Sequence, residues 1–161
     1  MLDAYIGIGS NLGDREATIR AAREALNRKA GSIGASSSIY DTAPWGPVPQ
    51  GNYLNQVVRI STKLSPRELL TVLHDIERAA GRDRENEVRY GPRTLDLDIL
   101  LYGDRLVQED GLTIPHPEIT TRAFVLVPLA EIAPDLAVDG KLVRELVGRI
   151  DTSGVARHEP D

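Results

Sequence analysis

Two aspartates separated by a single residue, Asp96 and Asp98, are the side chains that most directly suggest chemistry in this sequence. They lie in the segment TLDLDILLY (residues 94–102), whose alternation predicts a strand with both carboxylates on one face. The same alternation predicts that the other face carries the apolar side chains Leu95, Leu97, Ile99 and Leu101. Adjacent carboxylates repel each other, and bound Mg²⁺, which prefers oxygen ligands, would relieve that repulsion. Two Mg²⁺ ions on such a pair can hold a polyphosphate during in-line displacement, although a solvated strand face without a role fits the same pattern.

Arginines directly before this strand suggest what the carboxylates would face. The segment RDRENEVRYGPR (residues 82–93) contains four of them, Arg82, Arg84, Arg89 and Arg93. Cations beside metal-binding carboxylates are expected where a highly anionic third component, such as a nucleoside triphosphate, lies between them. Pairing with acidic residues of the same segment is the alternative. It accounts well for Arg84 and Arg89 and less well for Arg93, which follows a rigid Gly-Pro turn.

A flat heterocycle is the ligand that the few aromatic residues suggest. Tyr53 and Asn55 begin a predicted strand on a shared face, where a ring would stack on the tyrosine and pair its edge with the amide. The preceding loop, TAPWGPVPQGN (residues 42–52), contains Trp45 and is predicted to be irregular because it is rich in Pro and Gly. For Phe124, the only Phe, ordinary core packing is the preferred interpretation when the residue is taken alone.

The glycine-rich start of the chain matches neither of the common phosphate-binding motifs. GIGSNLG (residues 7–13) follows a predicted strand, but Leu12 stands where a dinucleotide fingerprint needs Gly, and Gly13 is not followed by Lys. We therefore expect a tight turn whose small residues leave room for a ligand or a neighbouring backbone. Covalent catalysis has little support, because the chain contains no Cys and no G-x-S-x-G elbow. His116 is held in a stiff Pro-His-Pro segment without a second His nearby in sequence.

The elements that must position these side chains follow a split-βαβ order. Strands are predicted at residues 3–9, 33–41, 53–64, 94–102 and 105–107, the last two joined by a hairpin at Gly103-Asp104. Helices are predicted at 14–29, after the capping box Ser65-Pro66-Arg67-Glu68, after Thr120 or Thr121 with an interruption at Pro128, and at 141–149. This order is typical of an α+β sandwich in which the helices cover one face of a mainly antiparallel sheet.

Length and composition limit the class of protein. The 161 residues carry 24 acidic and 19 basic side chains, a net charge of −5, and are expected to form one domain, 1–161, with a loose tail at 151–161. A mildly acidic chain is a poor candidate for binding nucleic acid. No apolar run approaches the roughly 20 residues of a membrane span, and no secretory signal is visible, so we expect no membrane partner and a cytoplasmic location.

Six stretches distributed over about residues 4–134 resemble one enzyme family: YIGIGSNLGD, TAPWGP, YLNQVV, RYGPRTLDLDILLYG, IPHPE and TRAFVLVPLAEIAP. The family is 6-hydroxymethyl-7,8-dihydropterin pyrophosphokinase of folate biosynthesis. The resemblance implies a ferredoxin-like α+β sandwich and a monomer that uses ATP, two Mg²⁺ ions and a reduced pterin. In that reaction the β,γ-pyrophosphoryl group of ATP moves to the pterin hydroxymethyl oxygen and AMP is released. A different Mg²⁺-dependent phosphoryl transferase and a ligand-sensing module with solvated aspartates are the alternatives.

The resemblance also implies residue roles, at positions that match the family. Asp96 and Asp98 would bind Mg²⁺, and Arg82 and Arg93 would neutralise phosphate charge as part of the catalytic set. The implied pterin-binding residues are Thr42, Ala43, Trp45, Tyr53, Asn55 and Phe124. The implied ATP-binding residues are His74, Glu77, Arg82, Arg84, Arg93, Ile99, Thr113, His116 and Arg122. No residue stands out as the base for the hydroxymethyl proton.

Overall fold

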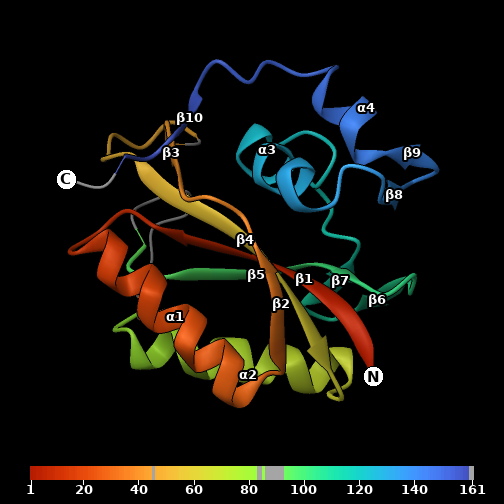
Figure 1. The fold of residues 1–161 in the computed structure, drawn as a ribbon. Coiled ribbons are helices and arrows are strands. Elements are labelled where there is room, and N and C mark those ends of the chain that lie inside the picture. The colour runs from red at the N-terminus through yellow and green to blue at the C-terminus, as the bar shows by residue number, and fades with distance from the viewer. Residues whose placement is uncertain (45, 83–84, 86–92, 160–161) are drawn as a thin grey trace.

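The computed structural model describes residues 1–44, 46–82, 85 and 93–159, and an antiparallel sheet runs through its centre (Figure 1). The predictions for Trp45 and Arg84 therefore lie outside the described residues. The strands are β1 (Leu2–Ser10), β2 (Ser32–Ser36), β3 (Tyr40–Thr42), β4 (Tyr53–Thr62), β5 (Asp96–Tyr102), β6 (Val107–Glu109), β7 (Leu112–Ile114), β8 (Ala137–Val138), β9 (Lys141–Leu142) and β10 (Val155–Arg157). The helices are α1 (Arg15–Lys29), α2 (Pro66–Ala79), α3 (Ala123–Ile132) and α4 (Val143–Val147).

The main sheet has the order β10-β3-β4-β1-β5, and β2 also pairs with β4. All of its strand pairs are antiparallel. Because β2 and β3 follow each other along the same edge of β4, they act as one interrupted strand, and the order is that of a split βαβ unit. The predicted α+β, ferredoxin-like class is confirmed. None of the helices in the described residues is long and apolar enough to span a membrane.

The two long helices begin where the sequence predicts. The Asp14 side chain accepts a hydrogen bond from the backbone N–H of Ala17 at 3.2 Å, which caps α1. At α2, the Ser65 hydroxyl accepts from the Glu68 N–H at 3.1 Å, and the Glu68 carboxylate accepts from the Ser65 N–H at 2.9 Å. This capping box satisfies two amides that a helix start leaves unpaired.

Helices cover both faces of the sheet, which corrects the prediction that they lie on one face. In Figure 1, α1 and α2 pack below the sheet and α3 and α4 above it. One core joins Ile19 and Leu73 to the first face, and a second core joins Leu126 and Leu129 of α3 to Tyr5 on the other. The apolar side chains of the segment after Arg122 supply this second layer.

A β-bulge in β5 corrects the predicted alternation of that strand. Tyr5 pairs with Leu101 and the next residue, Ile6, pairs with Ile99, so Leu100 is an extra residue without its own partner. Leu97 and Ile99 lie in the core under α1 and α2, whereas Leu100 and Leu101 both lie in the core under α3. Leu101 is therefore not on the predicted face, because the bulge resets the alternation.

Three further predictions about the C-terminal half are wrong. The chain turns at Gly103, but the hairpin pairs β6 with β7 around Gly111 instead of pairing with β5. Helix α3 begins at Ala123, and its N-cap residue is Arg122, which makes no side-chain capping hydrogen bond. The helix also continues through Pro128 instead of being interrupted there. Residues 155–157 do not belong to a loose tail, because they form β10 and pair with β3.

Candidate active site

The two aspartates of β5 lie opposite glycines of β1. Asp98 pairs with Gly7 and Asp96 with Gly9, and all four line one pocket, here called the glycine pocket. Since glycine has no side chain, the space beside the carboxylates stays open. The prediction that Asp96 and Asp98 share a face is confirmed.

The surroundings of Asp98 disfavour its charged form. Burial, followed by the negative charge of Asp96, raises the pKa of Asp98 to about 8, against the opposing charges of Arg122 and Arg82. The nearby arginines therefore do not offset the cost of ionising both carboxylates, and a bound divalent cation would favour the doubly ionised pair. Within the described ranges, no group of three or more His, Asp or Glu side chains could hold a metal. Two carboxylates suit Mg²⁺, which takes its other oxygen ligands from substrate phosphates and water.

Arg82 joins helix α2 to the start of β5. Its Nη1 donates to Glu77 Oε2 at 2.6 Å and to Asp96 Oδ1 at 3.0 Å. The same Glu77 oxygen accepts from the Leu97 backbone N–H at 2.8 Å, and the Glu77 side chain is only 1% exposed. Removing one partner of such a buried ion pair lowers the free energy of unfolding by about 3–5 kcal/mol. Glu77 therefore holds the Arg82 side chain in this orientation.

A second pocket, of about 250 Å³, lies on the other side of Asp98 beside the β6–β7 hairpin and is called the hairpin pocket. Ile99, Thr113 and His116 line it together with Asp98. The structure thus brings together three residues that the resemblance assigns to ATP. Asp98 is in the wall of both pockets, so a ligand in one meets a ligand in the other at this carboxylate.

His116 is fixed by its backbone and by its ring. Its N–H donates to the carbonyl of Leu100, the bulge residue, at 3.0 Å. Its Nδ1 accepts from the Glu118 N–H at 3.1 Å, so the neutral ring carries its proton on Nε2. Burial, and then the positive charge of Arg122, lower the pKa of His116. The ring is therefore a neutral hydrogen-bond donor at neutral pH.

Arg122 is the N-cap residue of α3. It forms an ion pair with Glu118, and its guanidinium lies 5.4 Å from the centre of the Phe124 ring. The charge of Arg122 also acts on both Asp98 and His116. This cation therefore links the carboxylates, the hairpin pocket and the aromatic wall of the glycine pocket.

The glycine pocket lies where a flat ring is predicted to bind, and its volume of about 20 Å³ would have to widen to admit one. Asn55 and Phe124 both line it, and Asn55 Nδ2 donates to Thr42 Oγ1 at 2.7 Å. A methyl group on Gly9 would lie 2.8 Å from Asn55 Oδ1 and 3.5 Å from Tyr53 Cδ1. Tyr53 and Asn55 therefore share a face, as predicted, and Gly9 is the residue that makes room for them.

Some of the predicted residues lie outside the walls of both pockets. This group consists of Thr42, Ala43, Tyr53, His74, Glu77, Arg82, Arg93 and Arg122. The ligand-binding roles of these residues, like those of the residues that line the pockets, stay predictions.

Asn11 has structural contacts that no motif in the sequence predicts. Its side chain accepts from the Arg93 N–H at 2.8 Å and donates to Gln50 Oε1 at 2.6 Å, so it joins the loop before β4 to the segment before β5. A polar residue between glycines in a turn was the only signal for it.

Comparison with known proteins identifies the family. The family model described as 7,8-dihydro-6-hydroxymethylpterin-pyrophosphokinase (HPPK) matches residues 5–134. Similar proteins named 2-amino-4-hydroxy-6-hydroxymethyldihydropteridine pyrophosphokinase occur in several bacteria. The protein from Methylorubrum extorquens is 47% identical over 160 residues, covering 99% of this chain and 100% of its own. The protein from Haemophilus influenzae is 45% identical over 149 residues, covering 91% of this chain and 92% of its own.

Solved structures agree in fold. A Plasmodium falciparum HPPK-DHPS triple mutant with SDX-DHP matches with a TM-score of 0.75 at 16% identity over 92% of this chain. The wild-type P. falciparum HPPK-DHPS matches with a TM-score of 0.72 at 16% identity over 98% of this chain. This chain spans 44% and 47% of those two chains, which are longer. Taken with the family model and the relatives, this establishes that the chain belongs to the 7,8-dihydro-6-hydroxymethylpterin-pyrophosphokinase family.

Proposed function

We propose that this chain transfers the β,γ-pyrophosphoryl group of ATP to 6-hydroxymethyl-7,8-dihydropterin, in the synthesis of tetrahydrofolate. The position of Asp98 in the wall of both pockets carries this proposal. A heterocycle in the glycine pocket and a triphosphate extending from the hairpin pocket would meet at the carboxylate pair. Reaction by positioning and charge neutralisation then needs no nucleophile from the protein.

The atoms balance in one displacement. The hydroxymethyl oxygen bonds to the β-phosphorus of ATP, and the bond from that phosphorus to the oxygen bridging the α- and β-phosphates breaks. AMP leaves with the bonding electron pair, and the hydroxyl proton is lost from the pterin. The products are AMP and the pterin diphosphate. An ordinary kinase would instead release ADP.

On the pterin side, the ring would lie beside Phe124 and Tyr53, with Asn55 and Thr42 reading its edge. The hydrogen bond from Asn55 Nδ2 to Thr42 Oγ1 turns the amide oxygen of Asn55 toward Gly9, where it can accept from a donor on the ring. The amide and hydroxyl therefore present a fixed set of acceptors and donors to a planar heterocycle.

On the nucleotide side, Asp96 and Asp98 would hold two Mg²⁺ ions. When bound, Mg²⁺ supplies positive charge that neutralises the triphosphate oxygens. Arg82 and Arg93 would add to this charge, and the neutral His116 would donate from Nε2. Arg122 would hold negative charge between the two pockets. We further propose that the chain acts as a monomer, with ATP and the pterin as its partners.

A direct assay tests this function. The chain is incubated with ATP, Mg²⁺ and 6-hydroxymethyl-7,8-dihydropterin, and adenine nucleotides are separated by chromatography. We expect AMP in equal amounts to the pterin diphosphate. A 6-methyl pterin without the hydroxyl is the control, which should occupy the pocket and release no AMP. ADP as the product would overturn the proposal in favour of a simple phosphoryl transferase.

A further inference from the structure

The last described strand, β10, returns to the first half of the chain and lies along β3 (Figure 1). Residues 154–158, here called the C-terminal strap, continue this contact beyond both ends of the strand. The Ala43 N–H donates to the Gly154 carbonyl at 3.2 Å, and the His158 N–H donates to the Ile39 carbonyl at 2.8 Å. The match to the family model ends at residue 134, well before the strap.

We propose that the C-terminal strap is a positioning segment for the pterin side of the site. It holds β3, and with it Thr42 and Ala43, in place against β4 and α3, which carry Asn55 and Phe124. The proposal rests on the proposed function in one respect, namely that the glycine pocket binds the pterin.

The strap supplies much of the hydrogen bonding that fixes β3. This strand has only three residues, and it is followed by the Pro- and Gly-rich loop. Without β10 it would be an edge strand held by β4 alone. Antiparallel ladders alternate bonded and non-bonded pairs, and the 154/43 and 158/39 pairs are bonded. The pair midway between them, Ala156 with Asp41, is therefore also a bonded pair.

One side chain of the strap reaches α3. Arg157 Nη2 lies 3.7 Å from Glu131 Oε1 near the C-terminal end of that helix. Glu131 also accepts from the Tyr40 hydroxyl at 2.5 Å and from the Ser38 N–H at 2.8 Å. The carboxylate therefore joins α3, the start of β3 and the strap. Because Phe124 is in the first turn of the same helix, this contact fixes the aromatic wall relative to β3.

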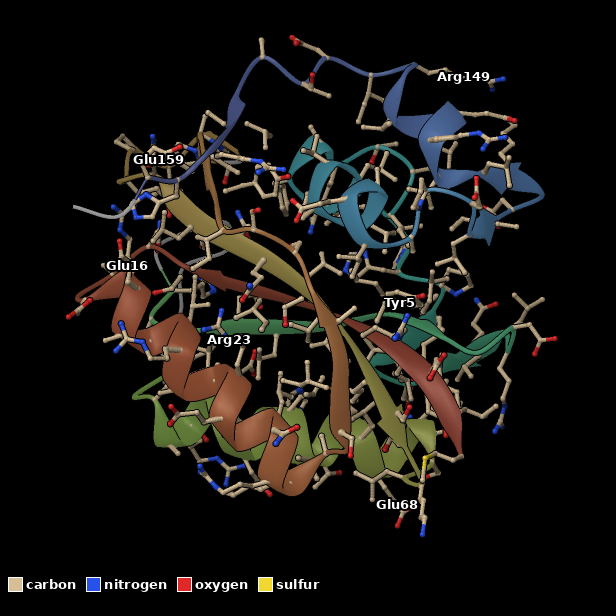
Figure 2. The ribbon with its side chains drawn as sticks, in the orientation of Figure 1. Tyr5, Glu16, Arg23, Glu68, Arg149 and Glu159 are labelled. Atoms are coloured by element: carbon tan, nitrogen blue, oxygen red, sulfur yellow. The ribbon has the colours of Figure 1, made fainter. Side chains whose placement is uncertain are left out.

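A second side chain of the strap reaches α1. His158 Nε2 pairs with Glu16, and its Nδ1 lies 4.0 Å from Asp41 Oδ2. Figure 2 shows Glu159, the next residue, above the first turn of α1, where Glu16 is labelled. Asp41 in turn accepts from Asn52 Nδ2 at 2.9 Å, at the end of the loop before β4. Through Asp41, the strap also holds the end of the loop that directly precedes Tyr53, the proposed pterin-binding residue.

These contacts converge on the side of the site opposite the nucleotide. None of the strap residues lines the hairpin pocket, and none contacts the carboxylates of β5 in the part of the chain that the structure describes. Loosening the strap should therefore weaken pterin binding and leave ATP binding almost unchanged. A purely structural role would weaken both together.

The test replaces Ala156, whose side chain is exposed, by proline in the full-length chain. Proline removes the ladder N–H, and its ring disturbs the pairing with β3. Ala156→Thr keeps the N–H and is the matched control. Binding of the pterin and of a nonhydrolysable ATP analogue with Mg²⁺ is measured by calorimetry. We expect A156P to raise the pterin Kd about tenfold and the ATP-analogue Kd by less than about twofold, with A156T like the unmodified chain.

A second variant tests the same role without disturbing the backbone, in case A156P does not fold. Arg157→Gln combined with His158→Gln keeps the backbone ladder and removes both side-chain contacts, and it should raise the KM for the pterin with little change in kcat. Unchanged pterin affinity in both variants, or equal losses for both ligands, would overturn the role of the strap. The unmodified chain is assayed first. If it released no AMP and bound no pterin, the proposed function itself would fail.

Discussion

At the scale of single residues, Asp98 concentrates the chemistry of the site. Its neighbours on the strand are apolar, and it meets Asp96 on one face and the two pockets on either side. The raised pKa of Asp98 arises from this crowding. The crowding that disfavours ionised Asp98 in the folded chain also favours the binding of a doubly charged cation beside it.

Replacing Asp98 by Asn should abolish most turnover without harming the fold. The amide has the same shape but no charge, so it holds Mg²⁺ much more weakly, and we expect a loss of about 10²–10³-fold in kcat. Thermal unfolding should not shift downward, because the substitution replaces a carboxyl group whose charged form burial disfavours. Asp104→Asn, at an exposed turn residue, is the control and should leave both measurements unchanged. Near-normal turnover in Asp98→Asn would contradict the metal-binding role.

His116 should make the protein sensitive to mild acid. Burial and Arg122 lower the pKa of His116 in the folded state below its ordinary value of 6.5. As the pH falls below that value, the unfolded chain binds a proton that the folded chain does not, so the free energy of unfolding decreases. His116→Gln should show a smaller decrease between about pH 7.5 and pH 5.5 in urea unfolding. Identical pH slopes for both proteins would contradict this assignment.

The residues of the site were predictable to different degrees. The spacing of Asp96 and Asp98 predicts a shared face, and the structure confirms it, because the bulge begins only after both. The contacts of Asn11 and Glu77 were not predictable, because they join segments far apart in the sequence: Asn11 bonds to Gln50 and Arg93, and Glu77 to Leu97.

At the scale of elements, β1 shapes the site as much as β5, the strand that carries the aspartates, because its glycines leave space for neighbouring side chains. Gly9 of β1 lies against Asn55 of β4, and Gly7 lies against Leu100 of β5. The two glycines differ in how closely these neighbours approach. This difference provides a matched pair of substitutions within one strand.

Gly9→Ala should weaken pterin binding more than Gly7→Ala does. The new methyl group at Gly9 would lie 2.8 Å from Asn55 Oδ1, which must then move and lose its alignment with Thr42. At Gly7 the nearest atom is Leu100 Cδ2 at 3.6 Å, an ordinary contact. Calorimetric titration should give a pterin Kd about tenfold higher for Gly9→Ala, the worth of one buried hydrogen bond. Equal affinities for the two variants would show that Asn55 does not read the ring.

Element boundaries were predictable where a local signal exists and not where pairing decides. Asp14 and Ser65 mark the starts of α1 and α2 because their side chains cap the helices themselves. Gly103 and Gly111 both have positive φ and both form turns, and local sequence does not distinguish which turn joins paired strands. The Gly103 N–H donates to the Asp3 carbonyl at 2.7 Å, a contact with β1 that carries the chain off the sheet.

At the scale of the whole molecule, the sheet has a core on each face, and β1, β4 and β5 contribute to both. The sequence of α3 is apolar on nearly all sides, so it has no single face from which its packing could be predicted. Helix α1, with a polar outer face, was predictable for the opposite reason.

Because the two cores share three strands, they should unfold together. Leu26→Ala under α1 and Leu126→Ala in α3, both at fully buried positions, should each lower the free energy of unfolding by about 2–5 kcal/mol. Urea unfolding followed by near-UV and by far-UV circular dichroism should stay a single coincident transition with unchanged m in both variants. Two separate transitions in Leu126→Ala would show that the α3 layer is an independent unit.

The bulge at Leu100 also determines how this strand tolerates a change in length. If Leu100 were deleted, Ile99 would be followed directly by Leu101, and strict alternation would still place Leu101 under α3 and Tyr102 under α2. Hydrophobic register therefore does not require the extra residue. What deletion would remove is the carbonyl that accepts from the His116 N–H. A one-residue insertion relative to a regular strand thus serves to anchor a loop to the strand that carries the two aspartates, and a shorter β5 would keep its core while releasing that loop.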